Sequence, residues 1–100
     1  MSITDELLKQ FKDRMHLGDH EDDNIKGILS ASVVDLREKC GNYDIYSDER
    51  FKELVFERAR YVYNDALEFF NDNFISQINS LLISNALSEI VLEDDADASV

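Results

Sequence analysis

The sequence predicts an all-α protein: a small bundle of about four helices, with a long central helix at about 49–70 and an acidic, flexible C-terminal tail. Three observations lead to this fold class. Proline is absent and glycine occurs only three times, so little interrupts a helix. Apolar residues recur at three- and four-residue spacing. A chain of 100 residues, 44% of them hydrophobic, suits one modest core. We expect one helical domain over 1–92 and a tail over 93–100.

The first helix is expected from Asp5 to about His16. Thr4 can cap its start, because a threonine side chain accepts a hydrogen bond from a free backbone N–H of the first turn. Gly18 follows at a position where glycine often ends a helix. The apolar residues of this segment share one sector at 100° per residue; they are Leu7, Leu8, Phe11 and Met15.

A polar turn at 19–23 leads into a second helix that ends at Cys40. An aspartate of this turn can cap the helix, and Gly41 stands at the usual stop position. The spacing of the apolar residues predicts one buried stripe. Its members are Ile25, Ile28, Leu29, Ser32, Val33, Leu36 and Cys40. The segment 41–47 is expected to form a loop whose tyrosines lie against the body.

The third helix is the long central one, which Asp48 can cap and which we place at about 49–70. Its apolar side is wider than one partner helix needs, so we expect it to pack on two sides. The asparagine- and aspartate-rich segment 71–73 predicts a break, and a kinked continuation stays open as an alternative.

The fourth helix, from about Phe74 to Ser88 or slightly beyond, has an unusual composition. No charged side chain occurs in 73–88, and apolar residues cover more than the 100° or so that a peripheral helix buries. The excess is buried either inside the bundle or against a neighbouring subunit. We favour a neighbouring subunit, because so short a chain offers little cover. The candidate subunit contacts on this helix are Ile75, Ile78, Leu82, Ile83 and Leu87.

Three residues of the third helix are further candidates for a subunit contact. Arg58 and Asp65 are seven residues apart, two turns along one face, and Tyr61 lies between them. One interpretation places the charges at the edge of the apolar stripe, where they reach water or pair weakly. The other is a polar pairing at a subunit interface, where charges set register and orientation.

The charge of the chain excludes several classes of partner. Acidic residues number 22 and basic residues 10, for a net charge of −12. This balance argues against wrapping nucleic acid and against anionic membranes, since both need an excess of bases. No apolar run is long enough to predict a transmembrane helix. The first ten residues do not resemble a signal peptide. Cys40 is the lone cysteine, so no intrachain disulfide is expected and an intracellular location is favoured.

Catalytic, metal and cofactor sites are not expected. His16 and His20 have a spacing that suits zinc on one continuous helix, but Gly18 lies between them, and a solvated turn is favoured. The acidic turn also lacks the glycine and glutamate of a calcium-binding loop. No phosphate-binding or nucleophile motif occurs, and Cys40 falls on an apolar stripe. We therefore predict that the protein is not an enzyme.

The order of these segments resembles a known family. A short helix with Leu7-Leu8-Lys9 precedes the acidic turn 17–25, and a helix ending at Cys40-Gly41 comes next. A long aromatic helix follows, and then 74–83 (Phe-Ile-Ser-Gln-Ile-Asn-Ser-Leu-Leu-Ile). Over about residues 5–90 this pattern is similar to the small head–tail connector proteins of long-tailed bacteriophages, also called adaptor or head completion proteins.

The resemblance implies a structural role in the virion. Such proteins are mainly helical and form a ring of about a dozen copies beneath the portal protein. The ring extends the DNA channel, through which DNA passes without sequence-specific binding, and it offers a docking surface for the next head-completion or tail protein. The implied location is the head–tail interface of the virion, after synthesis in the host bacterial cytoplasm. The family supplies no catalytic residues, and the acidic tail 93–97 departs from its pattern.

A second function from another class stays open. A small acidic helical protein could regulate a partner by binding its basic surface, as a mimic of DNA charge. Such a mimic should be a compact monomer or dimer whose binding weakens steeply with salt. An adaptor should instead co-purify with the portal or capsid.

Overall fold

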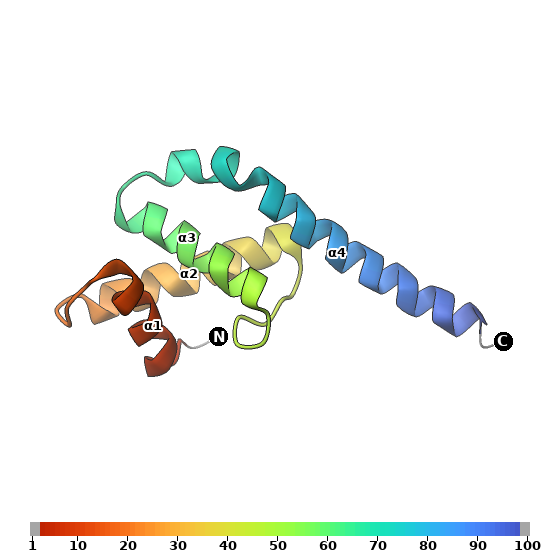
Figure 1. The fold of residues 1–100 in the computed structure, drawn as a ribbon, viewed down its shortest axis with the longest axis horizontal. Coiled ribbons are helices and arrows are strands. Elements are labelled where there is room, and N and C mark those ends of the chain that lie inside the picture. The colour runs from red at the N-terminus through yellow and green to blue at the C-terminus, as the bar shows by residue number, and fades with distance from the viewer. Residues whose placement is uncertain (1–2, 99–100) are drawn as a thin grey trace.

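The computed structural model describes residues 3–98, with side chains described through residue 89. Within this part of the chain the fold is all-α, without a strand, which confirms the predicted fold class (Figure 1). Four α-helices and one short 3₁₀-helix follow one another within residues 3–98. They are α1 (Asp5–Met15), α2 (Asp22–Cys40), α3 (Glu49–Tyr63), η1 (Leu67–Phe69) and α4 (Phe70–Ala98).

The core lies where α2 packs against α1, α3 and the first turns of α4. Its largest fully buried side chains come from three different elements: Phe11 on α1, Phe51 on α3 and Phe70 at the start of α4. Phe11 meets Phe56 edge to face, with ring centroids 5.5 Å apart, and so joins α1 to α3. The predicted capping residues Thr4 and Asp48 both accept hydrogen bonds from backbone N–H groups three residues ahead.

The long helix predicted for about 49–70 ends instead at Tyr63. Asp65 adopts a left-handed conformation, with φ of 56°. The N–H of Ala66 donates to the Tyr61 carbonyl over 2.8 Å, and that of Asp65 donates to the Val62 carbonyl over 3.1 Å. This pair of bonds is a Schellman motif, which satisfies the last carbonyls of a helix. Aspartate tolerates the left-handed region better than most residues, so the chain reverses here and continues into η1.

Helix α1 also ends at a residue in the left-handed conformation. That residue is not Gly18, which the sequence had suggested. His16 takes the left-handed conformation, with φ of 58°, while the Leu17 N–H donates to the Lys12 carbonyl over 2.9 Å. The predicted boundary near residue 16 is confirmed, but the residue that turns the chain is a histidine.

The break expected at 71–73 is a kink inside one helix, which agrees with the kinked continuation. Phe74 has non-helical angles (φ −119°, ψ 16°), and α4 then continues beyond the bundle (Figure 1). The molecule is elongated for this reason, with extents of 58 × 29 × 17 Å. The prediction of a flexible tail over 93–100 falls on residues whose side chains lie outside the described part. Among the described residues, no helix is both long and apolar enough to span a membrane.

Candidate subunit-contact surface on α4

One side of α4 is held against the end of α2 by three neighbouring residues. The Cys40 thiol donates to the Ile78 carbonyl, with 3.7 Å between sulfur and oxygen. The Tyr43 hydroxyl donates to the Leu81 carbonyl over 2.6 Å. Gly41 lies so close to Asn85 that a Cβ on the glycine would be 2.5 Å from its Cγ. We call residues 40–43 the clamp, since they contact successive turns on one side of α4.

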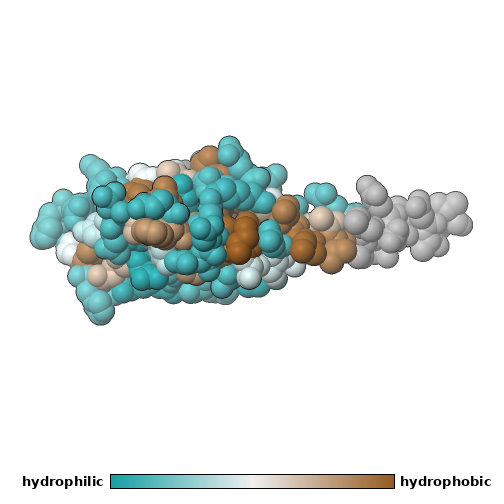
Figure 2. All heavy atoms as spheres, turned by 90° about the horizontal axis from the view of Figure 1, so that it is seen from above, coloured by the Kyte–Doolittle hydropathy of each residue, from teal (hydrophilic) through white to brown (hydrophobic). Residues whose placement is uncertain are grey.

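Outside the part of its surface that the clamp contacts, α4 exposes large aliphatic side chains to solvent. Exposed fractions are 49% for Ile75, 45% for Leu82, 56% for Ile83 and 53% for Leu87. We call these four residues the α4 apolar face. They occur at spacings of seven, one and four residues, which gathers them on one broad side of a helix. The hydrophobic surface at the base of the projecting segment in Figure 2 lies on α4.

Ile78, the fifth predicted contact on this helix, belongs to the core of the chain itself. It is only 6% exposed, and its backbone carbonyl accepts the bond from Cys40. Both are isoleucines of one helix, but α2 covers the side of α4 that carries Ile78, and no described residue covers the side that carries Ile83. The sequence identified an over-apolar helix but could not tell which side was free.

Tyr61 and Arg58, predicted as subunit contacts, are used within the chain. Tyr61 packs edge to face on Phe70 and Phe74, with ring centroids 5.8 and 5.6 Å away, and its hydroxyl accepts a bond from Asn73 over 3.1 Å. Tyr61 therefore fixes the root of α4, including its kink.

Arg58 turns toward α2. Its Nε lies 3.1 Å from an Asp35 carboxylate oxygen, and its Nη1 donates to the fully buried Ser32 hydroxyl over 2.9 Å. Asp65 has left the helix and stands exposed in the turn after α3. The structure thus does not bring Arg58 and Asp65 together on one helical face. Arg58 pairs inside the chain, an interaction that spacing along one helix could not reveal.

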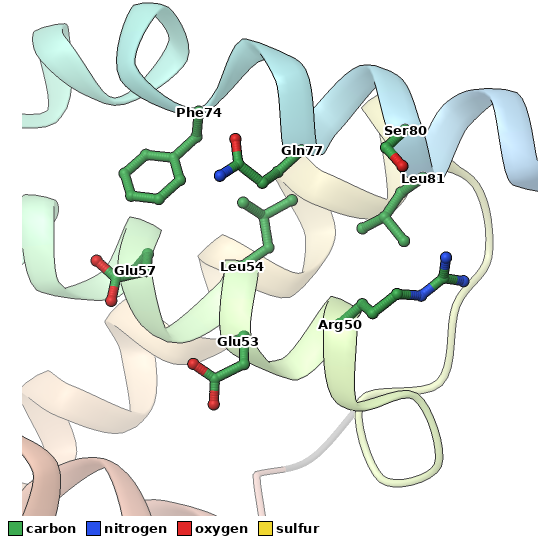
Figure 3. Close-up of a pocket in the computed structure, with 8 residues that line it drawn as sticks. All are labelled: Arg50, Glu53, Leu54, Glu57, Phe74, Gln77, Ser80 and Leu81. Atoms are coloured by element: carbon green, nitrogen blue, oxygen red, sulfur yellow. The ribbon is translucent and has the colours of Figure 1, made fainter.

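An open groove of about 530 Å³ runs between α3 and the first turns of α4 (Figure 3). Its apolar floor consists of Leu54, Phe74 and Leu81, whose side chains point into the space between the two helices. Polar residues form the rim. They are Gln77 and Ser80 on α4, and Arg50, Glu53 and Glu57 on α3. We call this feature the α3–α4 groove. No motif indicated it, since it depends on the angle at which α4 crosses α3.

The two glutamates of the rim are already paired within the chain. Glu53 accepts a hydrogen bond from Arg14 over 2.6 Å, and this bond holds the pKa of the Glu53 carboxyl below its ordinary value. Glu57 accepts from Arg60 over 2.6 Å. Arg50 is less tightly paired, because its guanidinium lies 3.6 Å from the Asp48 carboxylate and is 60% exposed. Among the charged residues of the rim, Arg50 is therefore the most exposed and the least tightly paired.

The described residues offer little for metal or covalent chemistry. No group of three or more His, Cys, Asp or Glu side chains among them could hold a metal ion. Lys12 bonds both Asp19 and Asp22, which ties the acidic turn to α1. The Cys40 thiol is buried, and this burial raises its pKa, which disfavours the reactive thiolate.

The candidate site is therefore a surface for contact. The α4 apolar face, the α3–α4 groove and the clamp lie on or beside the same helix. Other exposed apolar side chains, Leu67 and Phe69 on η1 and Val34 on α2, lie outside these features. Comparison of the chain with protein-family models, with curated proteins and with solved structures found no match in any of the three.

Proposed function

We propose that the protein is a virion structural adaptor, a head–tail connector whose copies form a ring under the portal protein. In this role it extends the DNA channel and offers a docking surface to the next head-completion or tail protein. The observation that carries the proposal is the α4 apolar face, which stands exposed on a helix that projects from the bundle. The resemblance of the segment order to connector proteins supports the same role.

The physical argument begins with the cost of exposing aliphatic side chains. Large contiguous apolar patches are uncommon on monomers and mark contact sites, because burying apolar surface contributes roughly 25 cal/mol per Å². Copies that each carry a charge of −12 repel one another. The charge-free stretch 73–88 is a surface on which they can meet with the least repulsion. Repeated contacts between identical copies then suit an assembly.

The net acidity fits a channel protein as well. DNA gains affinity for a surface when bases on that surface displace its counterions, and an acidic surface offers no such gain. DNA can then slide past without sticking. A charge mimic of DNA would use its acidic surface for binding, and it would leave the α4 apolar face without a role. This face therefore favours the adaptor over the acidic regulator.

The proposal is tested by complementation of a phage whose own copy of this gene is deleted. The variant Leu82→Ser/Leu87→Ser should leave the folded monomer intact and lose incorporation into particles, because it removes exposed side chains only. Val34→Ser is the matched control, since Val34 is equally exposed but lies on α2. Particles should contain this control. Normal incorporation of the α4 variant, or absence of the wild-type protein from particles, would contradict the proposal.

A further inference from the structure

We propose that the α3–α4 groove of one copy receives the α4 apolar face of the next copy. This inference rests on the proposed ring, and it specifies which two surfaces meet. The contact is heterologous: each copy inserts one surface and receives another. Leu82, Ile83 and Leu87 of the incoming helix lie over Leu54, Phe74 and Leu81 of the receiving copy.

The dimensions of the two surfaces are compatible. A helix with its side chains is roughly 10–12 Å wide, so the incoming α4 lies along the groove and only its side chains enter. The groove volume of about 530 Å³ has room for several aliphatic side chains. Its floor is apolar, and the α4 wall carries only the uncharged Gln77 and Ser80. No charge needs to be stripped of water on that wall.

The same chain cannot fill its own groove. Residues 74–81 form one wall, and the continuous helix α4 carries Leu82, Ile83 and Leu87 onward, away from the bundle (Figure 1). The clamp holds the helix in this direction through Leu81 and Asn85. These three side chains can therefore enter only the groove of another molecule.

Charge favours the groove over a contact between two α4 helices. Helix α4 contains six acids and no lysine or arginine, so two α4 segments side by side would bring acids together without a base. The groove supplies a base through its α3 wall. Arg50 is the least committed charge there, since the glutamates of the rim are bonded to Arg14 and Arg60.

Arg50 also sets the direction of the incoming helix. It stands at the end of the groove near Ser80 and Leu81, and Glu57 stands at the end near Phe74 (Figure 3). On the incoming helix the acids lie past the apolar residues, beginning with the exposed Glu89. Glu89 therefore faces Arg50, and the incoming α4 runs in the same direction as the α4 that forms the groove wall. A repeated contact of this kind closes into a ring or continues as a filament.

Cross-linking distinguishes this contact from others. In Gln77→Cys/Leu87→Cys, one cysteine marks the groove rim and the other the apolar face, and both parent side chains are exposed. At high protein concentration, a short bis-maleimide should convert this variant into a ladder of dimers, trimers and larger species. Neither single substitution, Gln77→Cys or Leu87→Cys, should give a ladder, and nor should the wild type, because Cys40 is buried in all of them. Unchanged melting temperatures would show that the variants are folded.

Two outcomes would overturn the proposal. In the first, Leu87→Cys alone cross-links to dimers and the double variant gives no ladder. This result would show a symmetric contact between two α4 helices. No cross-linking, either in concentrated solution or in assembled particles, would show that these surfaces do not meet. Arg50→Glu should lower the ladder yield several-fold, and Arg50→Glu/Glu89→Lys should restore it. If the ladder yield is the same in both variants as in the parent, the proposed direction of the incoming α4 is wrong.

The test separates this contact from the proposed function. A protein that enters particles but gives no ladder there is an adaptor that assembles through other surfaces. A protein that gives the ladder in solution but never enters particles uses this contact outside a virion.

Discussion

The Tyr43 hydroxyl donates a hydrogen bond to the backbone carbonyl of Leu81 over 2.6 Å, which joins the loop after α2 to a turn of α4. Burial raises the pKa of this hydroxyl, so it stays protonated as a donor. The ring stacks on Phe51, with centroids 5.6 Å apart, and is thereby positioned for the bond. This bond is one of the contacts that hold α4 in the direction in which it leaves the bundle.

Tyr43→Phe should weaken the hold on α4 without disturbing the stacked rings. We expect a loss of about 0.5–1.5 kcal/mol in the free energy of unfolding, the usual contribution of one hydrogen bond. Amide hydrogen exchange at 82–85 should become faster. Tyr46→Phe is the control, because its hydroxyl lies in the same loop and accepts from the Thr4 N–H instead. Equal exchange in both variants would show that the bond does not hold α4.

Gly41→Ala should be strongly destabilising. The backbone angles at Gly41 (φ 120°, ψ 177°) lie in a region used almost only by glycine, and occupying it costs another residue about 1–3 kcal/mol. The added Cβ would also be 2.5 Å from the Cγ of Asn85 and would push α4 outward. Thermal and denaturant unfolding measure the effect.

Gly27→Ala provides the matched comparison for Gly41→Ala. Gly27 lies within α2, and a Cβ there would meet nothing within 4 Å. Alanine is favoured over glycine in a helix by about 0.5–1 kcal/mol, so this variant should be more stable than the wild type. Similar losses from both substitutions would contradict the geometry described for the clamp.

Arg58→Ala should lower stability while leaving self-association unchanged. The variant leaves the buried Ser32 hydroxyl without the arginine and removes one partner of Asp35, and an unpaired buried polar group costs about 1–3 kcal/mol. Arg60→Ala is the control, because Arg60 is more exposed and pairs within its own helix. It should change stability by less than about 0.5 kcal/mol. If Arg58→Ala has a normal melting temperature but an altered oligomeric state, Arg58 lies at the subunit interface.

The Arg14–Glu53 pair predicts a defined dependence on pH. The pKa of Glu53 in the folded chain lies below its ordinary value of 4.5, because the carboxylate accepts a hydrogen bond from Arg14. The pair therefore stabilises the fold above that ordinary value, and the contribution disappears as pH falls through the lower, folded pKa. Glu53→Gln should melt at a lower temperature than the wild type at neutral pH, and the difference should vanish in acid.

Glu49→Gln is the control for Glu53→Gln, since the Glu49 carboxylate is 80% exposed and pairs with Lys52 of its own helix. A melting temperature that Glu53→Gln lowers by the same amount at every pH would show that Glu53 acts through packing and not through its charge.

Local signals account for the parts of the fold that the sequence predicted. Thr4 and Asp48 have side chains that can cap a helix in isolation, and the stripe from Ile25 to Cys40 follows the helical period. The end of α3 could not be predicted in this way. The apolar spacing continues through Ala66 and Phe69, and aspartate is tolerated both in a helix and in the left-handed turn that Asp65 makes.

The candidate site was predictable only in composition. The charge-free stretch 73–88 showed that one helix needed additional cover. It could not show that α2 would take Ile78 and leave Leu82, Ile83 and Leu87 free, because the choice depends on the packing of segments about 40 residues apart. The groove and the partners of Arg58 arise in the same way, from contacts between helices.

The clamp also determines how the molecule would bear force. Its contacts on Ile78, Leu81 and Asn85 are arranged one after another along the length of α4. A pull along that helix loads all of them together as shear, whereas a pull across it would open them one at a time. Tension applied to the projecting helix is thereby passed to the end of α2 and into the core. If the protein has the adaptor role proposed above, this joint would suit a vertex that holds packaged DNA under pressure.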